Sequence, residues 1–108
     1  MSRRRILFIC GRGRQRSPTA ADIYPGLLDC RTDYAGLSKD ADSPLTPEQI
    51  EWATEIAVME PRHQATLRHE FGPHLRQKRV VCLNVPDRFR FMQPELVDLL
   101  TERAGRLR

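Results

Sequence analysis

The chain has 108 residues, of which 40% are hydrophobic and 30% charged, and its formal net charge at pH 7 is +4. These proportions exclude an intrinsically disordered chain and predict one globular domain over residues 1–108. The longest apolar run, residues 6–10, is too short to span a membrane, and the arginines before it do not introduce a signal-peptide core. We therefore expect a cytoplasmic protein without a membrane partner.

The first third of the chain predicts a strand, a helix and a second strand. Residues 5–10 (RILFIC) are almost continuously apolar, which is typical of a strand buried on both faces of a parallel sheet. After a loop with two glycines, Ser17 can cap a helix whose first position is Pro18 and which ends near Tyr24. Residues 27–34 alternate more weakly and predict a second strand.

The middle third repeats this alternation. Residues 35–45 are rich in Gly, Ser, Asp and Pro and predict a loop. Thr46 and Gln49 then supply a capping box for a helix that ends near Thr54. Residues 55–59 (EIAVM) predict a third strand.

The last third contains two helices on either side of a fourth strand. Pro61 opens the first helix, residues 79–85 (RVVCLNV) form the strand, and a loop leads to a final helix that begins at Pro94. In the first of these helices, the side chains expected to face the sheet are Ala65, Leu67 and Phe71. The final helix carries an apolar stripe of Leu96, Leu99, Leu100 and Leu107.

Strands that alternate with helices predict the α/β class, here a three-layer fold with a four-stranded parallel sheet and helices on both faces. Ligands of such sheets bind outside the carboxyl ends of the strands. The loops after Cys10, Met59 and Val85 therefore share one edge. This geometry brings Cys10 near Asp87.

Six arginines and no acidic residue occur in the first sixteen positions, which indicates an anionic ligand near the start of the chain. The loop between the first strand and the first helix can turn consecutive N–H groups inward at the positive end of the helix dipole. Arg16 can offer its planar guanidinium to two phosphate oxygens. The predicted phosphate-binding residues are Gly11, Arg12, Gly13, Arg14, Gln15 and Arg16.

Cys10 lies at the beginning of this loop and is the candidate nucleophile. The positive field of the loop favours the thiolate form, which is the reactive form of cysteine. The hydroxyl of Ser17 can donate a hydrogen bond to the sulfur, a role that competes with helix capping.

The strand, the C-x5-R-S-P segment and the helix resemble the low-molecular-weight protein tyrosine phosphatases, and the resemblance extends over the whole chain. A short branch of that superfamily, known mostly as predicted phosphatases, is more similar still. The segments that recur there in this order are Arg12, Arg14, Ser17-Pro18-Thr19-Ala20, Ala35-Gly36-Leu37-Ser38, Val58-Met59-Glu60 and Val85-Pro86-Asp87.

The resemblance implies a cysteine-dependent phosphatase without a cofactor or metal, acting on phosphomonoesters and above all on phosphotyrosine in proteins. By that similarity Cys10 attacks phosphorus, Arg16 holds the equatorial oxygens, and Asp87 acts as general acid and then activates water. Phe89 and Phe91 would wall the pocket that accepts an aromatic ring. The expected partners are a phosphorylated protein or a small phosphomonoester, with inorganic phosphate or sulfate also binding in the loop.

Two positions depart from the larger members of that family. Gly13 stands where an asparagine usually braces the loop, so its hydrogen bonds must be replaced or the loop is looser. Gln15 replaces a second loop cysteine found in many of them, so a protective disulfide with Cys10 cannot form. The chain is also shorter, which removes part of the pocket rim.

The remaining cysteines and histidines have plainer interpretations. Cys30 and Cys82 lie in strand segments and are expected to be buried packing residues, with a redox role as the rival. The cysteine spacing also argues against a disulfide framework and against zinc. Since His63, His69 and His74 lack metal-ligand spacing, we expect them to be solvated.

Three other functions stay open at the level of the sequence. An arsenate reductase would use the same loop but needs resolving thiols. A non-catalytic phosphate- or phosphoprotein-binding module would suit the missing asparagine and the crowded arginines. A nucleic-acid binder is disfavoured because only 6% of the residues are aromatic and no basic stripe is interleaved with them.

Overall fold

The computed structural model describes residues 3–108 and contains a four-stranded sheet whose strands are all parallel. The strands are β1 (Arg4–Cys10), β2 (Cys30–Gly36), β3 (Glu55–Val58) and β4 (Arg79–Cys82). Their order in the sheet is β2-β1-β3-β4, so β1 and β3 are central. The predicted α/β class with a parallel four-stranded sheet is confirmed.

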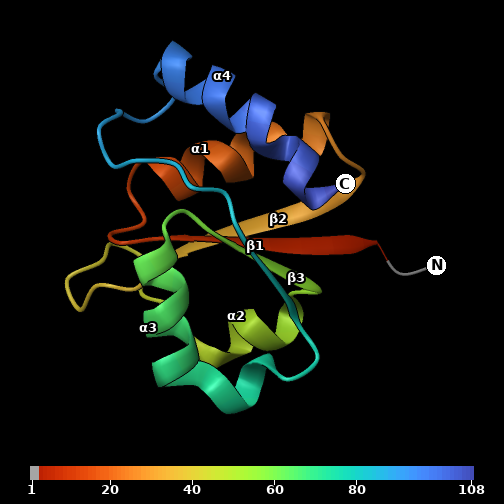
Figure 1. Ribbon diagram of the computed structural model, residues 1–108, viewed down its shortest axis with the longest axis vertical. Coiled ribbons are helices and arrows are strands. Elements are labelled where there is room, and N and C mark those ends of the chain that lie inside the picture. Colours follow the sequence, from red (N-terminus) through yellow and green to blue (C-terminus); the bar gives the residue numbers. More distant parts are fainter. Residues whose placement is uncertain (1–2) are drawn as a thin grey trace.

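The α-helices are α1 (Arg16–Ile23), α2 (Pro47–Trp52), α3 (Pro61–Phe71) and α4 (Pro94–Arg103). Short 3₁₀ turns follow three of them, at Tyr24–Gly26, Gly72–Leu75 and Ala104–Leu107. α1 and α4 cover one face of the sheet and α2 and α3 cover the other (Figure 1), which is the predicted three-layer arrangement. Within residues 3–108, no helix has the length and apolar character needed to cross a bilayer.

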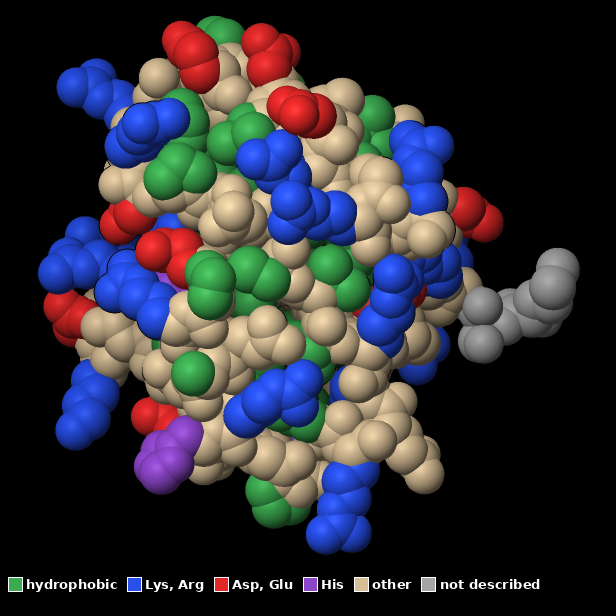
Figure 2. Space-filling view, in the orientation of Figure 1, with side chains coloured by type: hydrophobic (Ala, Val, Ile, Leu, Met, Phe, Trp, Pro, Cys, Tyr) green, Lys and Arg blue, Asp and Glu red, His purple; other side chains and the backbone are tan. Residues whose placement is uncertain are grey.

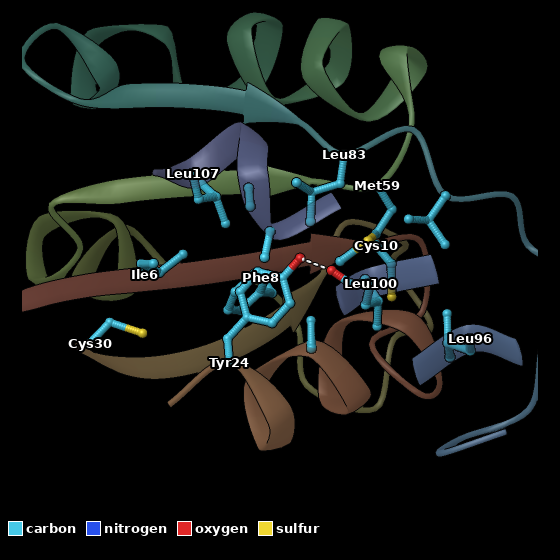
Figure 3. Packing of buried hydrophobic residues seen from close by; sticks show 14 residues of the cluster. Ile6, Phe8, Cys10, Tyr24, Cys30, Met59, Leu83, Leu96, Leu100 and Leu107 are labelled. Atoms are coloured by element: carbon cyan, nitrogen blue, oxygen red, sulfur yellow. Dashed lines mark hydrogen bonds between the residues drawn. The ribbon is translucent and has the colours of Figure 1, made fainter. Parts of the chain in front are cut away.

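Alternate side chains of β1 build two cores, one on each face of the sheet. Phe8 packs under α1 and α4, where its ring meets that of Tyr24 edge-on with the centroids 4.9 Å apart. The Tyr24 hydroxyl donates to the Leu100 carbonyl oxygen at 2.6 Å and so joins the turn after α1 to α4 (Figure 3). Leu7 and Ile9 belong to the opposite core. β1 is therefore buried on both faces, which explains its continuous apolar sequence.

One predicted helix cap is present and another is not. Thr46 caps α2, because its Oγ1 accepts a hydrogen bond from the Gln49 amide at 3.2 Å while the Gln49 side chain accepts one from the Thr46 amide at 3.1 Å. The prediction that Ser17 caps α1 is wrong. The helix begins at Arg16, and Ser17 lies inside its first turn with its hydroxyl against Cys10.

The second strand begins at Cys30, later than predicted. The amides of Leu27 and Leu28 both donate to the Tyr24 carbonyl oxygen at 2.9 Å, so these residues complete a turn and do not join the sheet. The strand also extends beyond its predicted end, because Gly36 still pairs with Cys10.

α3 turns two of its three predicted side chains toward the sheet, and the third position is wrong. Leu67 is buried and Phe71 packs against the same core, as expected. Ala65, however, is exposed, and His63 is buried with only 4% of its surface accessible, so the expectation of a solvated His63 is wrong. His63 and Leu67 are four residues apart and share one side of the helix, whereas Ala65 lies about 200° around the axis from His63.

Candidate active site

The connection from β1 to α1 brings two hydrogen-bonding groups to one sulfur atom. Cys10 is the last residue of β1 and is 3% exposed. The Gly13 amide donates to its Sγ at 3.2 Å, and the Ser17 hydroxyl oxygen lies 3.0 Å from the same sulfur. Donors arranged in this way stabilise a negative charge on sulfur, as a thiolate nucleophile requires.

The segment after β2 holds the loop from outside. Three amides in residues 37–42, those of Leu37, Ser38 and Asp42, donate to the carbonyl oxygens of residues 10–12 at 2.8 to 3.2 Å. Gly13 has a φ of +69°, which glycine adopts freely, and a Cβ there would lie 3.1 Å from the Gly36 nitrogen. Main-chain hydrogen bonds thus brace the loop, although residue 13 is a glycine and offers no side chain for this purpose.

Arg16 is the first residue of α1 and is almost completely buried, with 2% of its surface exposed. Its Nη1 donates to Glu60 Oε2 at 2.6 Å and to the Val85 carbonyl oxygen at 2.7 Å. Its Nε lies 3.8 Å from Asp87 Oδ1. Because both short contacts use Nη1, the edge formed by Nε and Nη2 can serve two oxygens of an anion.

Glu60 lies between β3 and α3 and balances the charge of Arg16. Its burial acts to raise its pKa, but hydrogen bonds from Arg62 and Arg16 outweigh this and lower the pKa of Glu60 to about 2. The carboxylate is therefore ionised at neutral pH. A fixed negative charge at 2.6 Å holds the guanidinium in one position.

A pocket of about 430 Å³ opens at this edge of the sheet. Its lining residues are Cys10, Gly11, Arg12, Arg14, Gln15, Arg16, Ser38, Arg62 and Asp87. The structure thus places Cys10, Arg16 and Asp87 around one pocket, where the loops after parallel strands meet. The Asp87 side chain is 57% exposed, so it can reach a bound molecule.

The arginines at the pocket rim are paired with acids of the loop after β2. Arg12 lies 3.4 Å from Asp40, and Arg14 lies 2.8 Å from Asp42. A hydrogen bond from Ser38, followed by the charge of Arg12, lowers the pKa of Asp40. Exposed pairs of this kind are weak, so either guanidinium can turn toward a ligand.

The two predicted pocket phenylalanines do not line this pocket. Phe89 packs against the core under α1 and α4, and Arg88 lies over its ring at 5.6 Å from the centroid. Phe91 is 50% exposed in the loop before α4. The walls of the pocket are polar, and an aromatic substrate would find guanidinium groups there and no phenylalanine.

Sequence reasoning missed three residues of this region: Glu60, Arg62 and His63. Glu60 had a usable signal, because it follows the third strand at the edge where ligands bind. The burial of His63 was also within reach, since Leu67 and Phe71 repeat at four-residue intervals from it. Arg62 left no signal, because an exposed arginine in a first helical turn is common.

Comparisons with known proteins agree on the fold. No protein-family model matches the chain, and no curated protein matches it. Solved structures do, and the arrangement they share with this chain is the fold of the low-molecular-weight protein tyrosine phosphatases. The resemblance stated from the sequence is thus confirmed for the fold.

Three of these structures show how far the similarity extends. Wzb from Vibrio vulnificus, in complex with benzylphosphonate, is 20% identical, with a TM-score of 0.76 over 96% of both chains. The tyrosine phosphatase Wzb from Escherichia coli K30, in complex with phosphate, is 18% identical, with a TM-score of 0.75 over 98% of this chain and 96% of that one. The YwlE arginine phosphatase from Geobacillus stearothermophilus is 23% identical, with a TM-score of 0.73 over 96% of this chain and 90% of that one.

Proposed function

We propose that the protein is a cysteine-dependent phosphatase that hydrolyses phosphomonoesters through a cysteinyl-phosphate intermediate. The observation that carries this proposal is the arrangement at the carboxyl end of β1: the Cys10 sulfur, the Arg16 guanidinium and the Asp87 carboxyl group all line one pocket. Phosphatases with this fold, among them tyrosine phosphatases and an arginine phosphatase, lend it support.

In the first step the Cys10 thiolate attacks phosphorus. A sulfur–phosphorus bond forms, the bond from phosphorus to the leaving oxygen breaks, and Asp87 gives its proton to that oxygen. Arg16 and the loop amides hold the three equatorial oxygens.

In the second step Asp87, now ionised, takes a proton from water. The water oxygen attacks phosphorus, the sulfur–phosphorus bond breaks, and inorganic phosphate leaves with the thiolate restored. The Ser17 hydroxyl lies 3.0 Å from the sulfur and stabilises it as the leaving group. Both steps use only groups of the protein itself and water, so no cofactor is needed.

The proposed substrate is phosphotyrosine in a cytoplasmic protein. The Cys10 sulfur is almost completely buried, and the ester carbon of phosphotyrosine lies at the end of a long, rigid side chain. The rim guanidiniums can also stack on its ring. Rates for phosphotyrosine, phosphoserine and phosphoarginine peptides of one sequence test this choice, and a preference for either of the last two would replace it.

The activity is tested by turnover of an aryl phosphate. We expect hydrolysis by the wild-type chain, none by Cys10→Ser, and a wild-type rate from the control variant Cys82→Ser, whose side chain packs against the opposite core. If phosphate binds tightly and wild-type turnover does not exceed that of Cys10→Ser, the protein is a binding module and the proposal fails.

The positions of the other thiols disfavour an arsenate reductase with an internal thiol relay. Cys30 pairs with Arg4, at the opposite end of β1 from Cys10, which is about 20 Å away for six residues of strand. Cys82 belongs to the core on the other face of the sheet. Neither sulfur can therefore reach Cys10 without unfolding part of the sheet.

The distribution of charge gives no support to a nucleic-acid binder. Figure 2 shows lysine and arginine side chains scattered over one face of the molecule, with acidic side chains among them. At the pocket, each rim arginine has an acidic partner. Binding to a nucleic-acid backbone needs a continuous basic surface, which this face does not present.

A further inference from the structure

His63 lies directly behind the anion-binding loop, in the first turn of α3. Its side chain is 5% exposed, and its Nε2 would be 3.9 Å from a Cβ placed on Gly11. Gly11 lines the pocket, so the imidazole supports the pocket wall from the protein side. None of the catalytic steps above uses this histidine.

The hydrogen bonding of His63 fixes its tautomer. Nδ1 accepts a hydrogen bond from the Glu60 amide at 3.2 Å, so it carries no proton in this arrangement. Burial, followed by the charge of Arg16, lowers the pKa of His63 to about 4. At neutral pH the ring is therefore uncharged, with its single proton on Nε2.

This Nε2–H is a buried donor without a hydrogen-bond partner among residues 3–108. An unpaired buried donor is costly and rare in a folded protein, so the position calls for an explanation. The nearest carboxylate oxygen, Glu60 Oε2, lies 3.6 Å away, just beyond hydrogen-bond distance. The same oxygen is 2.6 Å from Arg16 Nη1.

We propose that His63 is a positioning residue of the anion site, which acts by donating its Nε2–H to the Glu60 carboxylate and so fixing the Arg16 guanidinium. A small movement of the Glu60 carboxylate, as the Arg16 guanidinium bonded to it adjusts to an oxyanion, is enough to bring Nε2 and Oε2 within bonding distance. Contacts in unliganded sites commonly tighten in this way. The inference rests on the proposed function only in taking the loop as an oxyanion site.

The groups around His63 explain why a neutral donor suits this place. Arg16 from α1 and Arg62 from α3 are cations, whereas Glu60 and Asp87 are the acids that face it. A protonated histidine would add a further positive charge beside Arg16 and compete with it for Glu60. A neutral imidazole supports the carboxylate without that competition.

The experiment measures the dissociation constant of inorganic phosphate by calorimetry, using the full chain, together with steady-state kinetics on an aryl phosphate. His63→Leu removes the donor at similar volume, His63→Gln restores an N–H at nearly the same reach, and His69→Leu is the control on the exposed side of α3. We expect His63→Leu to weaken phosphate binding about tenfold or more and His63→Gln less than about threefold. His69→Leu should bind as the wild type does.

A double-mutant cycle separates positioning from packing. If His63 acts through Glu60, then Glu60→Gln and His63→Leu together weaken binding by much less than the product of their separate effects. Independent effects, or unchanged phosphate binding in His63→Leu, would overturn the inference. His63→Asn, whose shorter amide does not reach Oε2, takes the place of His63→Leu if that variant does not fold.

The outcomes also separate this inference from the proposed function. If the wild type binds phosphate but does not hydrolyse an aryl phosphate, the phosphatase proposal fails. The phosphate affinities of the His63 variants then still decide whether His63 positions Arg16. If His63→Leu has normal turnover, an unchanged KM and unchanged phosphate binding, His63 is not a positioning residue. The phosphatase proposal is unaffected by that result.

Discussion

Arg16 carries its charge at a position where only 2% of its surface meets solvent. A buried charge is tolerated when it is paired, and removing one partner of such a pair typically costs about 3–5 kcal/mol. Here Glu60 and the Val85 carbonyl oxygen are the partners, at 2.6 and 2.7 Å. The guanidinium is thereby held before any ligand arrives, which reduces the ordering that binding requires.

The first prediction concerns Asp87 as proton donor. We expect Asp87→Asn to lower kcat/KM, which reports the formation of the cysteinyl-phosphate, about 10²-fold or more for phenyl phosphate, because an amide cannot transfer the proton. The loss should be smaller for p-nitrophenyl phosphate, whose leaving group needs less protonation. Asp98→Asn, an exposed change on α4, is the control. An equal loss with both substrates contradicts the role of Asp87.

The second prediction concerns Ser17. Without its hydroxyl, the sulfur is a poorer leaving group, so breakdown of the cysteinyl-phosphate should become slower than its formation. We expect Ser17→Ala to reduce kcat about tenfold and to show a burst of released phenol in rapid-mixing experiments. Linear product release at the wild-type rate would show that the contact of 3.0 Å to Cys10 has no catalytic role.

At the scale of elements, the anion-binding loop depends on the segment that follows β2. Three amides of that segment, those of Leu37, Ser38 and Asp42, donate to the carbonyl oxygens of residues 10–12. The packing between the two is close, because a Cβ on Gly36 would lie 2.6 Å from the Arg12 carbonyl carbon. The geometry of the site therefore reflects two loops that are distant in sequence.

The third prediction tests this packing. We expect Gly36→Ala to destabilise the fold by about 1–3 kcal/mol, because the added methyl group must displace the backbone of the loop. Phosphate affinity should fall as well. Gly26→Ala is the matched control, since a Cβ at Gly26 has nothing within 4 Å. Urea unfolding measures the free energy of unfolding of both variants. Equal values would show that Gly36 is not closely packed against the loop.

The elements that could be predicted are those with strong local signals. β1 is continuously apolar, and the Thr46 capping box marks the start of α2. The beginning of β2 could not be predicted, because the amides of Leu27 and Leu28 turn back to Tyr24 and only the fold reveals this. The hydrogen bonds between the segment after β2 and the anion-binding loop could not be predicted either. They join main-chain groups, so they leave no pattern in the sequence of side chains.

At the scale of the molecule, the parallel topology assembles the site from separate segments. Cys10, Arg16 and Asp87 could be placed together from the sequence because loops after parallel strands meet at one edge. Behind them, Glu60 and His63 carried only local signals of position and of burial, and the contact of this pair with Arg16 could not be predicted. The importance of the pair comes from burial and from contact with Arg16, and both depend on how α3 packs on the sheet.

The fourth prediction concerns stability against pH. The pKa of His63 falls from 6.5 to about 4 on folding, so between these values the unfolded chain binds a proton that the folded chain does not. The free energy of unfolding should therefore decrease as pH falls from about 6.5 to about 4, with a slope of at most about 1.4 kcal/mol per pH unit. Chemical unfolding at several pH values measures the free energy of unfolding of the wild type and of His63→Gln. A slope that is identical in the two proteins contradicts a buried, neutral His63.

The most direct measurement is single-turnover trapping of phosphate on the protein. Asp87→Ala is mixed with an aryl phosphate, quenched in acid, and digested for mass spectrometry. The account predicts that the peptide containing Cys10 gains one phosphoryl group, and that Cys10→Ala in the same background gains none. Release of phenol with no label on Cys10, or a label on another residue, would contradict it.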